Sequence, residues 1–405
     1  MTTFDQFVRK SVLDKEDIDV FLDPNEPSWA QFDPELGYIL GNFMPRDGLD
    51  GCLTLSTVGR DGARTRIIYA DRPCRINTYG NSFTQCHQVN DHETWQEYLA
   101  AHLGEPIRNF GVGGFGVYQA YRRMVRTEKT DLAAKYIVLY IWGDDHHRSL
   151  LRCRHALTYP WWNSNGGASF HGNFWAHLEI DLQSGRFVES DSLLPTPESL
   201  YKMTDPDFMV EALRDDLMLQ MCLFCSERIS DPDTRAMNQL AEILQCPPVA
   251  SSEPDEMKQQ VSELRNAYAF SATRYIIDRA VDFADKQGSK LMIALFCPTA
   301  MQQLITTGRR YDQSIVDYLD KRRIRYFDMN RVHQEDFKCF NLPLDDYKKR
   351  YLTGHYSPAG NHFFAFAIKN AMVDWLDPKP ITYRTDGEAM IDFRGYLPDT
   401  RVDGS

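Results

Sequence analysis

Apolar residues recur along this chain in two periods, one typical of buried strands and the other of amphipathic helices. Five short, mostly apolar runs predict strands at Arg75–Tyr79, Ile107–Phe110, Lys135–Trp142, Leu291–Phe296 and Arg325–Phe327. Helical patterns lie between and after them, at Thr94–Leu103, Val117–Arg126, Ala267–Lys286, Ser314–Lys321 and Pro358–Leu376. The third run, KYIVLYIW, is apolar without alternation, as in a strand buried on both faces. Strand–loop–helix units in this order predict a three-layer α/β/α domain with a parallel sheet.

Two stretches interrupt this rhythm. Residues 1–72 are rich in turn signals, with β-like pieces at Cys52–Val58 and Arg64–Tyr69, and predict a β-rich N-terminal extension. Residues 146–265 predict an insertion with acidic helices, a loop at 246–256, and a hairpin formed by His177–Asp181 and Arg186–Glu189. The α/β domain then spans 73–380 and a C-terminal tail 381–405. Within the insertion, the aromatic stretch 159–175 could line a site or pack a small core of its own.

Composition narrows the function classes. The 405 residues carry a formal net charge of −12, whereas general nucleic-acid binders are more often basic. Without a run of about 18 apolar residues, no membrane-spanning helix is expected. The nine cysteines lack disulfide or zinc spacing, and Cys222 and Cys225 fall in an apolar helical stretch. Together with an N-terminus that lacks an apolar signal region, this predicts a cytoplasmic protein with reduced thiols.

Candidate chemistry gathers where the predicted strands end. Ser82 follows the first strand, Asn109 and a glycine-rich loop end the second, Asp144 and Asp145 follow the third, and His355 precedes the last helix. Ligands of open α/β sheets bind at the carboxyl ends of the strands. A hydroxyl, backbone donors on a glycine loop and a histidine are the parts that acyl transfer needs.

These blocks resemble the SGNH, or GDSL-type, hydrolase superfamily. Gly80-Asn81-Ser82-Phe83 is similar to its Gly-Asp-Ser block, 109–114 to its Asn-and-glycine block, 143–145 to its Gly-Asn-Asp block, and His355 to its final histidine. The resemblance covers about 75–145 and 265–377, and it implies a flavodoxin-like fold of the SGNH type.

The resemblance also implies roles. Ser82 would be the nucleophile, with its backbone N–H donating to the oxyanion, and Gly114, or else the adjacent Gly113, would supply a second backbone donor. His355 would be the general base. The implied substrates are carboxylic esters, such as short acyl groups (acetyl, for example) on a carbohydrate or small alcohol, and no metal or organic cofactor is implied.

Three positions depart from the family pattern. Asn81 replaces an aspartate in the same tight turn. An acid, Asp144 or in the other alignment Asp145, stands where the family has an asparagine that donates to the oxyanion, and an ionised carboxylate has no donor. Leu352 and Thr353 precede His355 where an orienting aspartate is expected.

The missing orienting group has several candidate replacements in the sequence. Asp345, Asp346, Asp328 or a backbone carbonyl could orient the imidazole of His355 instead of the aspartate. A metal site at 144–147 is disfavoured, because adjacent residues of an extended segment point to opposite faces.

The leading hypothesis is a serine esterase. An O-acyltransferase using the same residues is the alternative, and acceptor-dependent turnover would distinguish it from an esterase. A non-catalytic relative that binds carbohydrate or a protein partner is a third.

Overall fold

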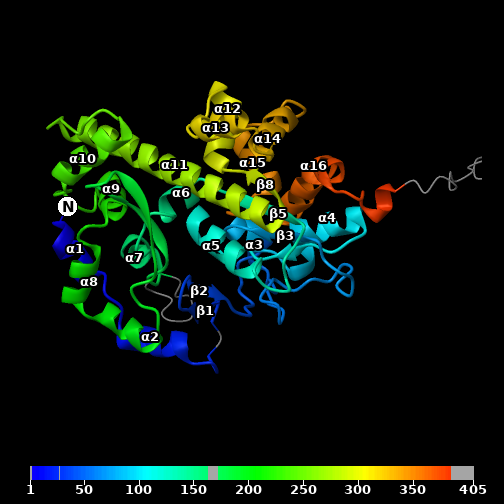
Figure 1. Ribbon diagram of the computed structural model, residues 1–405, viewed down its shortest axis with the longest axis horizontal. Coiled ribbons are helices and arrows are strands. Elements are labelled where there is room, and N and C mark those ends of the chain that lie inside the picture. Colours follow the sequence, from blue (N-terminus) through cyan, green and yellow to red (C-terminus); the bar gives the residue numbers. More distant parts are fainter. Residues whose placement is uncertain (1, 27, 163–171, 385–405) are drawn as a thin grey trace, which may run out of the picture.

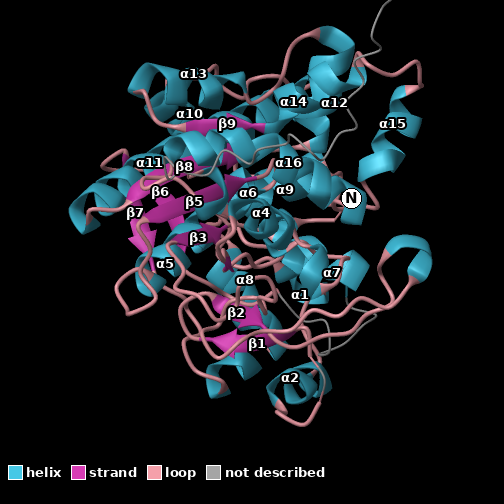
Figure 2. Cartoon of the chain, turned by 90° about the vertical axis from the view of Figure 1, so that its right-hand side faces the viewer, coloured by secondary structure: helices cyan, strands magenta, loops and turns pink. Residues whose placement is uncertain are grey.

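A five-stranded parallel sheet lies at the centre of the protein, which is described here from a computed structural model covering residues 2–26, 28–162 and 172–384. Its strand order is β4–β3–β5–β8–β9, and Figure 2 shows β3, β5, β8 and β9 side by side in this order. The bounds are β3 Ile76–Tyr79, β4 Arg108–Asn109, β5 Tyr136–Ile141, β8 Lys290–Leu295 and β9 Tyr326–Asp328. All four neighbouring pairs are parallel. The predicted α/β class with a parallel sheet is therefore confirmed.

Helices cover both faces of this sheet. All six residues of β5 are buried, and they alternate between two hydrophobic cores. Ile137, Leu139 and Ile141 pack into the core shared with α5 (Val117–Thr127) and α11 (Pro254–Gln287). The residues between them, Tyr136, Val138 and Tyr140, pack into the core shared with α4 (Trp95–Leu103) and α16 (Pro358–Trp375). This burial on both faces explains why the sequence of β5 is continuously apolar.

The carboxyl-terminal half of the domain adds four helices around β8 and β9. They are α12 (Pro298–Thr307), α13 (Gln313–Arg322), α14 (Met329–Phe337) and α15 (Leu344–Tyr351). Helix α13 packs into the core of α5 and α11, and α12 and α14 contribute residues to the other core.

The N-terminal extension differs from its prediction. It begins with two helices, α1 (Phe4–Lys10) and α2 (Lys15–Leu22), followed by the hairpin β1 (Ala30–Asp33) and β2 (Gly37–Leu40). Thr3 and Gln6 form a capping box at the start of α1, in which each side chain accepts a hydrogen bond from the backbone N–H of the other residue. The expected strands at 52–58 and 64–69 form only isolated bridges, such as Phe43 with Ser56 and Arg64 with Asn109. Residues 42–65, called the N-terminal loop below, are therefore an irregular segment held by side-chain contacts.

The insertion between β5 and β8 contains the predicted hairpin, β6 (His177–Asp181) with β7 (Arg186–Ser190). Its helices are α6 (Asp145–Arg148), α7 (His155–Trp162), α8 (Pro206–Leu213), α9 (Leu217–Cys225) and α10 (Thr234–Leu244). Helices α9 and α10 pack against the first half of α11 (Figure 1).

Helix α11 begins at Pro254 and not at Ala267, so the end of the predicted loop 246–256 is helical. Proline at the first position and acids at Asp255 and Glu256 are favourable at a helix start, which is the signal the periodicity analysis missed.

All nine cysteines lie within the described residues and are free thiols there. Among the described helices, none combines the length and the apolar composition that a bilayer crossing requires.

Candidate active site

Ser82 is the first residue of the short helix α3 (Ser82–Gln85), which follows β3 at the carboxyl end of the sheet. The side chain of Asn81 caps this helix by accepting a hydrogen bond from the Phe83 backbone N–H at 2.7 Å. A strand that turns directly into a capped helix holds the Ser82 hydroxyl at a fixed place on the sheet edge. The first residues of a helix also have backbone N–H groups without intrahelical acceptors, which suits Ser82 N–H for an oxyanion.

Asp145 ties this turn to the end of β5. Its carboxylate accepts hydrogen bonds from the Asn81 side-chain amide and, at 2.8 Å, from the Trp142 backbone N–H. Burial raises the pKa of Asp145 to about 7, against the opposing effect of Arg148. Asparagine at 81 is well matched to this place, because an ionised aspartate there would set two carboxylates against each other. Asp145 therefore holds the turn between β3 and α3, next to Ser82.

Asp144 lies in a different environment from its neighbour. Its side chain is 62% exposed, and its carboxylate lies 3.5 Å from Nη2 of Arg148. Among the described residues, no group of histidine, cysteine and acidic side chains is arranged to hold a metal ion.

His355 lies against Ser82, with 2.7 Å between Nε2 and the serine Oγ. On its other side, Oε1 of Gln88 accepts hydrogen bonds from the His355 ring Nδ1 at 2.9 Å and from its backbone N–H at 3.0 Å. The preceding residue, Gly354, has φ +105°, and a Cβ there would lie 2.9 Å from Gln88 Oε1. Only glycine allows the chain to approach the Gln88 amide so closely in this conformation.

The hydrogen bonds around Gln88 fix the tautomer of the histidine. Gln88 Nε2 donates to the backbone carbonyl of Asp47 at 2.8 Å, so the amide oxygen faces His355. An oxygen can only accept, and the proton of the neutral imidazole therefore sits on Nδ1. Nε2 is left with its lone pair toward the Ser82 hydroxyl, which is the arrangement a general base requires.

Gln88 thus occupies the place of the orienting acid, and the three aspartates considered from the sequence do not. Asp328 is buried in an ion pair with Arg310 at 2.5 Å. Asp345 and Asp346 lie on α15 in ion pairs with Lys348 and Lys349, at 3.5 and 3.0 Å. Gln88 was not predicted from the sequence, because it lies in the loop after α3 and belongs to none of the sequence blocks that indicate the site.

The electrostatic surroundings keep His355 neutral. Burial, together with the neighbouring His87 and Arg148, lowers its pKa to about 3, and Asp47 opposes this shift. Phe83 and His87 cover the imidazole, with ring centroids 5.0 and 5.2 Å away.

Gly113 and Gly114, the two candidate oxyanion donors, have different surroundings in the glycine loop after β4. The Gly113 N–H already donates to Gln85 Oε1 at 2.7 Å, so this group is engaged within the protein. Gly114 has φ +85°, a left-handed conformation, and a Cβ there would lie 1.9 Å from Nη1 of the buried Arg154. These contacts favour Gly114 over Gly113 as the second donor.

We expect Gly114→Ala to lower kcat by about 10²–10³, the effect of losing one oxyanion donor. The added methyl would meet the Arg154 guanidinium and the Tyr38 hydroxyl, which forces the loop to move. Gly288→Ala is a matched control, because Gly288 is also left-handed (φ +72°) but faces open space. Both variants should lose some thermal stability, and equal kcat values for the two would contradict a role of Gly114.

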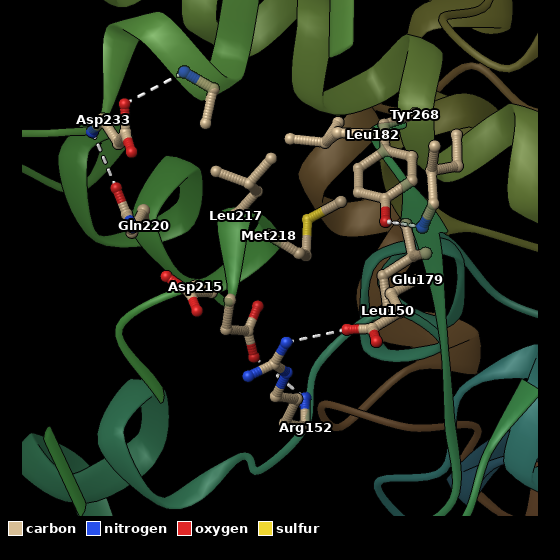
Figure 3. Close-up of a pocket in the computed structure, with 13 residues that line it drawn as sticks. Leu150, Arg152, Glu179, Leu182, Asp215, Leu217, Met218, Gln220, Asp233 and Tyr268 are labelled. Atoms are coloured by element: carbon tan, nitrogen blue, oxygen red, sulfur yellow. Dashed lines mark hydrogen bonds and ion pairs between the residues drawn. The ribbon is translucent and has the colours of Figure 1, made fainter. Parts of the chain in front are cut away.

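The insertion contains a separate cavity of about 230 Å³ (Figure 3). Arg152, Glu179, Asp216, Met218 and Tyr268 are among its lining residues, and none of the lining residues belongs to the Ser82 site. The aromatic stretch 159–175, considered from the sequence as a wall of the site, includes residues 163–171, which lie outside the described residues.

Comparison with known protein families finds no match for this chain, and no curated protein matches it.

Proposed function

We propose that this protein is a serine esterase of the SGNH type. The observation that carries the proposal is the continuous series of hydrogen bonds from Ser82 Oγ to His355 and from His355 to Gln88, 2.7 and 2.9 Å long. A nucleophile, a base within hydrogen-bond reach and a third group that orients the base form the arrangement that activates a serine. Its position at the carboxyl end of a parallel sheet supports the same assignment.

In the proposed reaction, Ser82 Oγ attacks the ester carbonyl carbon while His355 Nε2 takes the hydroxyl proton. The backbone N–H groups of Ser82 and Gly114 stabilise the negative charge on the carbonyl oxygen. His355 then returns the proton to the leaving alcohol, and an acyl-serine remains. A water molecule, deprotonated by the same nitrogen, attacks the acyl-serine, and His355 returns this proton to Ser82 Oγ as the carboxylic acid leaves.

The acyl group we propose is short, carried on a carbohydrate or small alcohol. This part of the proposal rests on the resemblance of the sequence blocks to the SGNH superfamily. Purified protein should hydrolyse p-nitrophenyl acetate faster than p-nitrophenyl butyrate. A fluorophosphonate probe should label it at Ser82, as mapped by peptide mass spectrometry. Labelling at another serine, or no hydrolysis of either ester, would overturn the proposal.

The acid limb of the pH profile should lie unusually low. Only neutral His355 accepts the serine proton, and its pKa is lowered to about 3 from an ordinary value near 6.5. The competent form is therefore populated throughout the pH range in which a typical serine–histidine enzyme loses activity. We expect kcat/KM for p-nitrophenyl acetate to show no acid limb from His355 between pH 8 and pH 5, since this ratio reports the free enzyme. Asp145, whose pKa is raised to about 7, titrates within this range, so the profile is measured in Asp145→Asn as well. A half-maximal value near pH 6.5 that persists in folded Asp145→Asn would contradict this.

A further inference from the structure

Residues 85–89 are the last residue of α3 and the short loop after it, together called the 85–89 loop, and they hold both Gln88 and His87 close to the base. Two of its residues, Cys86 and Gln88, adopt left-handed conformations, with φ +60° and +72°. Side chains other than glycine rarely adopt this conformation unless surrounding contacts impose it. The loop therefore depends on the groups that hold its backbone.

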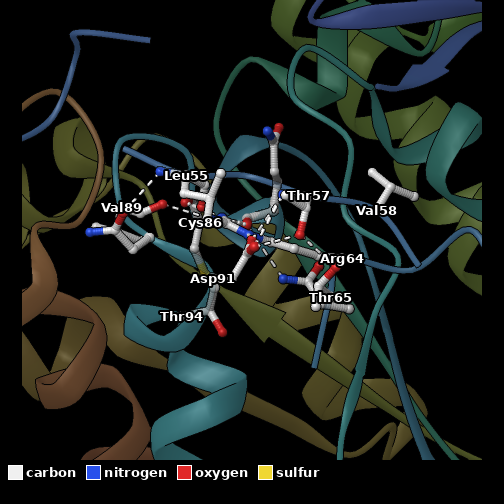
Figure 4. A network of polar contacts seen from close by, with 12 residues as sticks. Leu55, Thr57, Val58, Arg64, Thr65, Cys86, Val89, Asp91 and Thr94 are labelled. Atoms are coloured by element: carbon white, nitrogen blue, oxygen red, sulfur yellow. Dashed lines mark hydrogen bonds and ion pairs between the residues drawn. The ribbon is translucent and has the colours of Figure 1, made fainter. Parts of the chain in front are cut away.

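Arg64, in the N-terminal loop, is the main group that does so (Figure 4). Its Nη1 donates to the carbonyls of Gln85 and Cys86 at 2.6 and 2.7 Å, and its Nη2 donates to that of Val89 at 2.5 Å. Its Nε donates to Asp91 at 2.8 Å, and the two side chains are only 1% and 5% exposed. One guanidinium thus fixes three carbonyls of the loop, a task for which its rigid fork of donors is suited.

Asp47, in the same N-terminal loop, contacts the two side chains themselves. Its backbone carbonyl accepts from Gln88 Nε2 at 2.8 Å, and its Oδ2 lies 2.8 Å from Nε2 of His87. Its Oδ1 accepts from the Thr54 hydroxyl at 2.8 Å, which fixes the carboxylate in turn.

We propose that the N-terminal loop is part of the catalytic machinery, with Arg64 and Asp47 as positioning residues that hold the Gln88 amide and, through it, the tautomer of His355. This inference rests on the proposed function. If the amide turned over, its NH₂ group would face Nδ1 and could be satisfied only by the opposite tautomer. The proton would then sit on Nε2, which could not accept the proton of Ser82.

A double-mutant cycle tests whether Asp47 acts through Gln88. Asp47→Ala keeps the backbone carbonyl but removes the carboxylate contacts with His87 and Thr54 that hold this carbonyl against Gln88, at a site that is 25% exposed. It should lower kcat by about tenfold and leave KM within twofold. In a Gln88→Ala background the same change should have almost no further effect, because non-additivity marks residues that act as a unit. Losses that multiply in the double variant would overturn the inference.

Arg64→Lys tests the contact with the loop backbone. Lysine keeps the charge but cannot reach three carbonyls and Asp91 together, so kcat should fall by about 10². Arg310→Lys is the matched control, because Arg310 is equally buried (1%) and bonded to Asp312 and Asp328, with no contact to residues 85–89 among the described hydrogen bonds. Both variants should melt at lower temperature, and only Arg64→Lys should lose kcat. Equal kcat values in the two variants would overturn the inference.

The imidazole ¹⁵N chemical shifts of His355 separate this inference from the proposed function. Their values distinguish a protonated ring nitrogen from one with a lone pair, and they need no turnover. In the wild type we expect the proton on Nδ1, and in Asp47→Ala and Arg64→Lys a mixture of tautomers. A wild type that neither hydrolyses esters nor reacts with the probe would end the proposed function, while unchanged shifts in the Asp47→Ala variant would end this inference alone. If Arg64→Lys does not fold, the Asp47 variant decides.

Discussion

Ser82→Ala should lower kcat for p-nitrophenyl acetate by a factor on the order of 10⁶, the loss measured when a serine protease loses its catalytic serine. The variant keeps the oxyanion donors and the base but has no atom to attack the ester carbon. Among the described residues, only His355 forms a hydrogen bond with the Ser82 side chain, so the fold should be affected little. We expect the melting temperature to change by less than about 2 °C. Steady-state kinetics and differential scanning calorimetry measure the two effects.

The matched control for this change is Ser226→Ala. Ser226 donates its hydroxyl proton to the Cys222 carbonyl at the end of α9, in the insertion. Its removal should leave ester hydrolysis and probe labelling at the wild-type level. If Ser82→Ala retained wild-type turnover, the serine mechanism would be refuted, whatever the control did.

Gln88 should show the second-largest effect. In Gln88→Ala no side chain accepts the Nδ1 proton of His355, and loss of tautomer control costs a serine–histidine enzyme up to about 10⁴ in kcat. Gln88→Glu is the informative comparison. Its carboxylate can accept the Nδ1 proton, and it also raises the pKa of the His355 imidazole by about 1–3. We expect Gln88→Glu to recover much of the activity lost in Gln88→Ala at pH 8.

The pH profile of Gln88→Glu tests the direction in which the pKa of His355 shifts. The unprotonated ring is the active form, so a raised pKa of His355 moves the acid limb of kcat/KM to higher pH. The limb of Gln88→Glu should lie at least one pH unit above that of the wild type. The new carboxylate cannot donate to the Asp47 carbonyl, which offsets part of the gain at high pH. An acid limb at the same pH in both proteins would mean that residue 88 does not contact the imidazole in solution.

The sheet and much of the site could be predicted from the sequence because their signals are local. Each strand of the sheet overlaps a predicted apolar run to within a residue or two at either end. Such runs are buried on both faces and leave a strong pattern. Ser82 could be predicted because it directly follows a strand, and His355 because it shortly precedes the last helix. In a parallel sheet these two positions lie close together at the carboxyl edge.

The orienting group and the N-terminal loop could not be predicted in this way. Gln88 acquires its role from a left-handed backbone, from Arg64 and from Asp47, and no residue near it in sequence indicates these contacts. The roles of the two acids after β5 depend on which of them is buried, and adjacent residues give the sequence no means to separate them. Hydrophobic periodicity does not indicate the start of α11, because the first turns of this helix are mostly exposed.

The hydrogen bond between Ser82 and His355 joins residues 273 positions apart, and Gln88 and His355 are separated by 267. Contacts of such long range form late, because the entropy of closing a long loop must be paid before they bring any gain. During synthesis, the nucleophile leaves the ribosome long before its base does, so a partly made chain carries an unactivated serine. The proposed ester hydrolysis should therefore be among the last properties to return on refolding, which makes turnover a direct reporter of the fully folded state.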